Sequence, residues 1–132
     1  MKKFICLLII LLFSGSLFAG GDLRHRGSSF GRIESDGSVR IKGSIVGRFE
    51  SDGSIRVNGS IKGKIESDGS IRKNGSIVGR VESDNSVRVN GSIKGKIESG
   101  GDIRKDGSII GSAQGVDPRQ AAVIFFFEFF DY

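Results

Sequence analysis

Apolar residues recur at fixed positions within a 16-residue unit that begins at Gly21 and is repeated six times, ending at Val116. Three positions of each unit are apolar, with Ser29 of the first unit as the exception, and the spacing along the chain is 6, 4 and 6 residues. Most of these residues are β-branched, which favours strands, and the spacing lacks the 3.6-residue period of a helix. The first set is Leu23, Val39, Ile55, Ile71, Val87 and Ile103, the second is Ile45, Ile61, Ile77, Ile93 and Ile109, and the third is Ile33, Phe49, Ile65, Val81 and Ile97.

Each unit also contains two turn motifs, of which Ser35-Asp36-Gly37 and Val57-Asn58-Gly59 are examples. A three-residue loop places the flanking apolar residues on the same face of a hairpin, whereas a two-residue loop places them on opposite faces. We therefore predict three-residue loops at both motifs, each a type I turn followed by a left-handed glycine that forms a β-bulge. Glycine suits that position because a positive φ costs it little.

The segment between the two turns predicts one longer strand. Ile45, Gly47 and Phe49 alternate with other residues, so we expect both apolar side chains to face the core. The glycine lies between them on the core side, where the missing side chain lets the strand bend or another backbone approach. Each unit therefore offers one long strand, one short strand and two tight turns.

The six units predict a closed all-β meander of short hairpins. An open array would leave two unprotected strand edges, and pairing residues 21–24 with residues 111–114 removes both. The two outer units differ from the four central ones, as is usual at the ends of repeat arrays.

The run GRFESDGSIRVNGSIK, residues 47–62, resembles the repeats of the bacterial β-flower proteins, which are small secreted domains of hairpins arranged about a central axis. The Phe-rich C-terminal segment resembles the ends of the same proteins, so the resemblance covers about residues 21–130. It implies a shape and carries no catalytic residues. Five clean repeats suit the five-fold form of that family, while the count from the sequence is six.

The chain after Pro118 changes abruptly in composition. Residues 116–118 predict a turn, and residues 121–130 are apolar except for Glu128. We expect this segment to pack on or into the repeat domain, because the repeats alone make a thin core. The alternative is a partner-docking or membrane-contact surface, although ten residues are too few to span a bilayer as a helix. The residues of this core plug or partner surface are Phe125, Phe126, Phe127, Phe129 and Phe130.

Residues 1–19 read as a secretory signal peptide, with Lys2 and Lys3 before the apolar run 4–13 and Ala19 at the cleavage site. We therefore expect a periplasmic, cell-surface or secreted protein with a β-repeat domain at 20–118 and a Phe-rich segment at 119–132. Cys6 lies in the signal, so the mature chain would form no disulfide and present no thiolate.

The charge pattern of the chain limits the classes of partner that it could bind. The chain has a formal net charge of +5, and removing Lys2 and Lys3 leaves 18 basic and 15 acidic residues that alternate in sign along the repeats. This pattern makes nucleic acid a poor partner. The repeated arginines predict a solvated ladder of ion pairs with the glutamates, or else a ring that binds an anion or an acidic glycan. The arginines of that ring would be Arg40, Arg56, Arg72, Arg88 and Arg104.

No catalytic, metal or cofactor site is predicted. Glu34 and Asp36 recur in every unit without a distinct pair that could act as acid and base, and His25 is the sole histidine. Each turn offers one Asp, whereas calcium needs several converging oxygen ligands.

The sequence thus predicts a non-enzymatic, exported β-repeat module with a structural or binding role. Three alternatives remain open. The first is a module that binds a glycan, an anion or a cell-envelope component. The second is a membrane-associated or self-assembling protein that acts through the Phe-rich segment. The third is a right-handed β-solenoid that resembles the bactofilins and polymerises end to end. The Asp-Gly and Asn-Gly turns favour hairpins over the parallel rungs of a solenoid.

Overall fold

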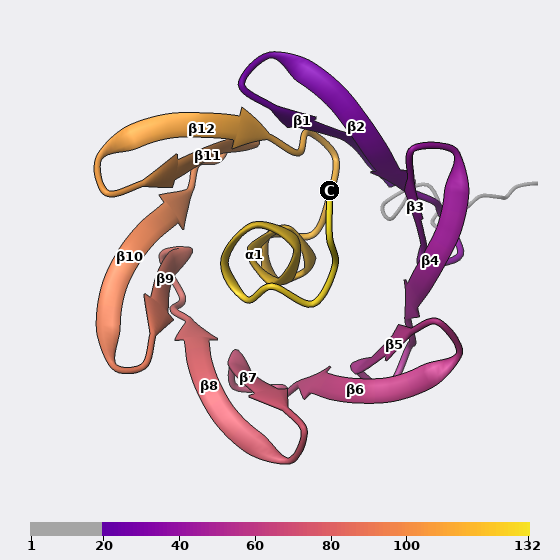
Figure 1. The fold of residues 1–132 in the computed structure, drawn as a ribbon. Helices are drawn as coiled ribbons and strands as arrows, with labels where there is room; N and C mark the ends of the chain where they lie inside the picture. The colour runs from indigo at the N-terminus through magenta and orange to yellow at the C-terminus, as the bar shows by residue number, and fades with distance from the viewer. Residues whose placement is uncertain (1–19) are drawn as a thin grey trace, which may run out of the picture.

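The computed structural model describes residues 20–132, so the predicted signal peptide lies outside the described residues. Within them, twelve strands close into one antiparallel ring around a single helix, α1, as Figure 1 shows. Arg24 of β1 pairs with Ser112 of β12, which confirms the predicted closure and the all-β hairpin meander. The elements are β1 Gly21–His25, β2 Ser28–Ile33, β3 Ser38–Ile41, β4 Ser44–Phe49, β5 Ser54–Val57, β6 Ser60–Ile65, β7 Ser70–Lys73, β8 Ser76–Val81, β9 Ser86–Val89, β10 Ser92–Ile97, β11 Asp102–Lys105, β12 Ser108–Ser112 and α1 Pro118–Phe126.

The Ser-Asp-Gly turns have the predicted three-residue form. The amide of Glu34 donates to the carbonyl of Ser38 at 2.8 Å, and the amide of Gly37 donates to the carbonyl of Glu34 at 3.0 Å. Gly37 has a φ of 92°, the left-handed conformation that the bulge requires. The carboxylate of Asp36 accepts a hydrogen bond from the Ser38 amide at 2.9 Å, which fixes the turn from within.

At the Asn-Gly turns the prediction of three-residue loops is wrong. Val57 pairs directly with Ser60, so the loop contains only Asn58 and Gly59, whose φ angles are 52° and 88°. Two successive positive φ values are those of a type I′ turn, which matches the twist of the flanking strands. Asn tolerates the left-handed conformation well enough for the two-residue turn to form.

The shorter loop reverses the side on which the second apolar set lies. Ile61 pairs with Arg56 and Gly63 with Ile55, so the intervening Lys62 forms a β-bulge. Ile61 therefore points to the opposite face from Ile55, because a change of one residue in register exchanges the faces of a strand. The expectation that this set lies in the core is wrong. Its members are 50–57% exposed: Ile45, Ile61, Ile77, Ile93 and Ile109.

The core lies between the inner face of the ring and the C-terminal segment. Residues of the first and third apolar sets line the inner face, and α1 occupies the middle of the ring (Figure 1). The Phe-rich segment packs into the ring as expected. The chain turns just before the helix, where the Val116 amide donates to the Ala113 carbonyl at 3.2 Å, and the predicted turn at residues 116–118 leads directly into α1, which begins at Pro118. Asp117 caps the helix by accepting a hydrogen bond from the Arg119 amide at 2.8 Å, and Pro118 takes the first helical position.

Candidate interaction surfaces

The Phe-rich segment contacts the repeats through their strand glycines, one glycine for each phenylalanine. A Cβ atom added to Gly47 would lie 2.5 Å from the ring of Phe130, and one added to Gly63 would lie 2.7 Å from Phe129. The remaining pairs are Phe127 with Gly79, Phe126 with Gly95 and Phe125 with Gly111. The segment therefore meets the units in reverse chain order. Sequence reasoning placed these glycines on the core side but missed that five of them match five phenylalanines.

In the first unit, Tyr132 packs against aromatic side chains of the repeat instead of against the strand glycine. Tyr132 stacks on Phe30 with ring centroids 4.1 Å apart, and His25 meets the Tyr132 ring edge-on at 5.6 Å. Burial raises the pKa of Tyr132, although 41% of the residue stays exposed. The sole histidine thus belongs to an aromatic cluster at the margin of the ring.

The repeated arginines lie on the outer wall of the ring, and five of them are paired with a glutamate. Arg56 Nε donates to Glu50 Oε2 at 2.7 Å, and its Nη1 donates to the carbonyl of Gly59 at 3.1 Å. The same two bonds recur in four further units, for Arg40, Arg72, Arg88 and Arg104, whereas within residues 20–132 Arg24 makes only the bond to its turn carbonyl, that of Gly27. Because Arg56 is also the strand partner of the exposed Ile61, the two residues share the outer face. This arrangement is the ladder of ion pairs, and binding of an anion or glycan there stays a prediction.

The two kinds of turn lie at opposite ends of the ring, because successive turns of an antiparallel meander alternate between its ends. We call them the Ser-Asp-Gly end and the Asn-Gly end. At the Ser-Asp-Gly end, the backbone amide of the following serine is the main cause that holds each turn aspartate's pKa below its usual range. This applies to Asp36, Asp52, Asp68 and Asp84.

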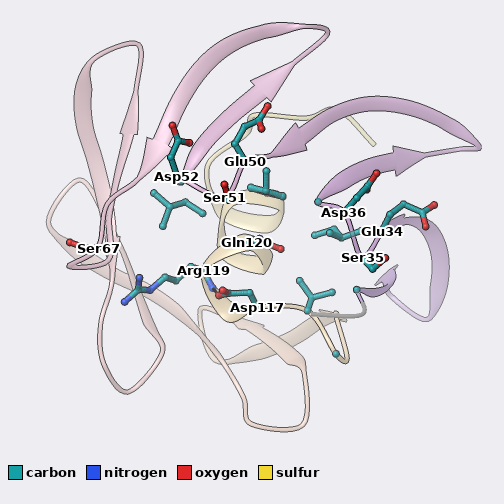
Figure 2. Close-up of a pocket in the computed structure, with 18 of the residues that line it drawn as sticks. Glu34, Ser35, Asp36, Glu50, Ser51, Asp52, Ser67, Asp117, Arg119 and Gln120 are labelled. Atoms are coloured by element: carbon teal, nitrogen blue, oxygen red, sulfur yellow. Dashed lines mark hydrogen bonds between the residues drawn. The ribbon is translucent and has the colours of Figure 1, made fainter. Parts of the chain in front are cut away.

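A hollow of about 580 Å³ opens at the Ser-Asp-Gly end, between α1 and the turns that follow β2, β4 and β6. Ile33, Phe49 and Val116 supply apolar lining. Figure 2 shows the first turn of α1, with Arg119 and Gln120, in the midst of the Ser-Asp-Gly turns. We call this cavity the end hollow. Its volume is typical of small-ligand pockets.

Over residues 20–132, no group of three or more His, Cys, Asp or Glu side chains is placed to hold a metal ion. In the same range, no helix is both long and apolar enough to cross a membrane.

Comparison with known proteins identifies one family. A family model described as bactofilin, polymer-forming cytoskeletal, matches residues 42–115, which is more than half of the chain. The match begins in the second unit and ends at residue 115, within the sixth. No curated protein and no solved structure matches the chain significantly.

Proposed function

This chain belongs to the bactofilin family, and from that membership we propose that it is a non-enzymatic structural module that assembles with copies of itself. The observation that carries the proposal is the family match over residues 42–115, because the family is described as polymer-forming. The repeats themselves support a structural role, since they multiply the same few residue types without forming one distinct asymmetric cluster.

The fold restricts how such assembly can occur. Every strand of the ring is paired on both sides, so no free strand edge is left to pair with another copy. The phenylalanines of the C-terminal segment are at most 7% exposed and hold the core together. Assembly through this segment would therefore require it to leave the ring. The contacts available to a second copy are side chains on the outer wall and at the two ends.

We also propose that the protein is exported and that its ring has the β-flower arrangement. The charged and apolar pattern of residues 1–19 supports export, and the hairpins set around α1 support the shape (Figure 1). Intact-mass measurement of the full-length gene product after expression tests export. Loss of about 19 residues is the expected result, and an unprocessed cytoplasmic chain would contradict it.

Sedimentation velocity and electron microscopy of the purified protein test self-assembly. We expect species larger than one chain that grow with protein concentration, because association is a mass-action equilibrium. A single monomeric species at every concentration would overturn the proposed function.

Binding of a glycan or anion is the second proposal, and the excess of basic residues on the outer wall favours it. Two of the glutamates there each pair with two arginines: Glu34 with Arg40 and Arg32 at 2.9 Å and 3.6 Å, and Glu82 with Arg88 and Arg80 at 2.7 Å and 3.9 Å. A glycan array tests this proposal, with Arg56→Ala as the variant. Hits that weaken with salt and with the substitution would support it, and an array without hits would count against it.

A further inference from the structure

The ladder of ion pairs is interrupted at one place, the seam where β1 pairs with β12 and closes the ring. The five ladder arginines each hold a glutamate through Nε at 2.7–2.9 Å and are half-buried. The sixth arginine, Arg24, is exposed and has no carboxylate within ion-pairing distance among residues 20–132. The cause lies in the sequence, because Gln114 stands at the position that a glutamate occupies in the other five units.

The Arg24 guanidinium is nevertheless held as in the other units. Its Nη1 donates to the carbonyl of Gly27 at 3.3 Å, the counterpart of the bond from Arg56 to its own turn carbonyl. The backbone of Gln114 lies beside β1, since a Cβ atom added to Gly21 would meet the Gln114 carbonyl oxygen. The five ladder pairs thus show how a carboxylate binds this guanidinium. At the seam, the carboxylate can come from another molecule.

The strand partners of Arg24 also differ from those of the ladder arginines. They are Ser112 on β12 and Ser29 on β2, whereas the partners of Arg56 are a second arginine and the exposed Ile61. Two small hydroxyl side chains therefore replace a long cation and a branched apolar group. They leave more room around the guanidinium and can both donate and accept hydrogen bonds.

The charges around the seam favour an anion. Arg26 adds a second cation in the turn after β1, and its amide donates to a carbonyl of β12. Of the aspartates in this region, Asp22 is already paired with an arginine of β2, and the amide of Asp106 donates to a carbonyl of β10, on the side away from the seam. Asp102 lies on β11, two strands or about 10 Å from the strand of Arg24.

We propose that Arg24 binds the carboxylate of an acidic sugar, and that the neutral groups beside it meet the hydroxyl groups of the same sugar. These neutral groups are the hydroxyls of Ser29 and Ser112 and the amide of Gln114. An exposed ion pair alone contributes little, so a ligand that adds hydrogen bonds to these groups binds better than a bare ion.

The seam site rests on the second proposed function, the binding of a glycan or anion, and it is the site of highest affinity for that ligand. On the ladder, an incoming anion must displace a glutamate that is tethered to the same chain and therefore has a high effective concentration. At the seam, the glutamine offers no such competing charge.

An NMR titration with glucuronate tests the seam site, with glucose as the matched ligand that lacks the carboxylate. The backbone amide signals of Ser29 and Ser112 report binding in every variant. Arg24→Gln removes the guanidinium, whereas Gln114→Glu keeps it and supplies the carboxylate that the other units have. Arg56→Gln is the matched control on the ladder, and the urea midpoint of each variant verifies folding.

We expect glucuronate to shift the seam signals of the wild type and glucose to leave them in place. Arg24→Gln and Gln114→Glu should each weaken glucuronate binding by about tenfold or more, the effect of losing one hydrogen-bonded charge pair. Arg56→Gln should bind as the wild type does. The converse change, Glu50→Gln, frees Arg56 from its glutamate and should add a second site on the ladder.

The outcomes separate the seam site from the proposed functions. Binding that survives Arg24→Gln but is lost in Arg56→Gln would place the anion on the ladder and overturn the seam site alone. Inorganic phosphate that shifts the seam signals at a lower concentration than glucuronate would overturn the acidic sugar as the ligand. A wild type without shifts overturns the seam site, and if the glycan array also gives no hits, glycan binding fails with it. Self-assembly is unaffected by either result, because sedimentation measures it independently.

Discussion

At the scale of single residues, the strand glycines satisfy two requirements at once. A Cβ atom on Gly63 would meet the carbonyl oxygen of Arg72 on the neighbouring strand and would lie 2.7 Å from the ring of Phe129. A side chain at Gly63 would therefore overlap both the backbone of the neighbouring strand and the aromatic ring of Phe129. Any larger residue must displace one of them, and the backbone cannot yield without breaking the ladder.

Gly63→Ala should destabilise the ring by about 1–3 kcal/mol, the usual cost of forcing an extra methyl group into a packed core. The matched control is Gly100→Ala, because Gly100 has open space around the added Cβ atom and no positive φ. Urea unfolding of the two variants measures the difference. Equal midpoints for the two variants would contradict the close packing between Gly63 and Phe129.

The turn aspartates make stability depend on acid. Their folded pKa values lie below the ordinary value of 3.8, so the folded state favours the charged carboxylate. The stabilisation is therefore present above pH 3.8 and is lost as the pH falls through the lowered folded pKa. We expect the urea midpoint of the wild type to fall in that window. The variant with all four turn aspartates changed to Asn should lose less, and an identical acid response would show that other groups cause the loss.

Lys42 and Arg26 are long-chain residues that adopt the left-handed conformation, which suits them poorly. Lys42 has a φ of 53° in a type I′ turn, where the corresponding turns contain Asn58, Asn74 and Asn90. Asn tolerates this conformation better than Lys, so Lys42→Asn should raise stability by about 0.5–1 kcal/mol. The reverse change Asn58→Lys should lower stability by a similar amount. Thermal unfolding of both variants checks the sign, and two shifts in the same direction would be inconsistent with this account.

At the scale of elements, the sequence predicts the strands and one of the two turn types, and it fails at the other for a defined reason. Ser35-Asp36-Gly37 has one glycine and forms the expected three-residue loop, whereas Asn58 and Gly59 both accept a positive φ and form a two-residue loop. The apolar spacing is the same at both turns, so spacing alone cannot distinguish them. The bulge at Lys62 compensates for the one-residue difference in loop length, and Ile61 lies on the outer face as a result.

Helix α1 could have been predicted from the sequence, but we did not predict it. Asp117 followed by Pro118 is the usual start of a helix, and the apolar run after it continues without a breaker. Asp117→Ala should lower stability by about 1 kcal/mol because the Arg119 amide loses its acceptor. Asp117→Ser keeps an acceptor and should be close to neutral. Chemical denaturation of both variants tests the cap, and similar losses would argue against it.

At the scale of the whole molecule, the count of repeats and the C-terminal segment depend on each other. The sequence alone indicated six units but also resembled a five-fold family, and the closed ring contains six units with five phenylalanines against five strand glycines. Periodicity predicts the number of hairpins, but it cannot reveal what fills the middle, because that packing depends on contacts between residues far apart in sequence.

Deleting residues 53–68 tests whether the C-terminal segment sets the size of the ring. The deletion removes one unit in register, together with Gly63, so Phe129 loses its site in a narrower ring. We expect a loss of stability larger than the 3–5 kcal/mol that is typical of a Phe→Ala change. Phe129→Ala should cost about 3–5 kcal/mol in the complete ring of strands. In the shortened ring of strands it should restore stability, since it removes the phenyl group that no longer fits. Urea unfolding of the four chains measures this coupling. Purely additive effects would mean that the strands determine the ring size and that the C-terminal segment merely fills it.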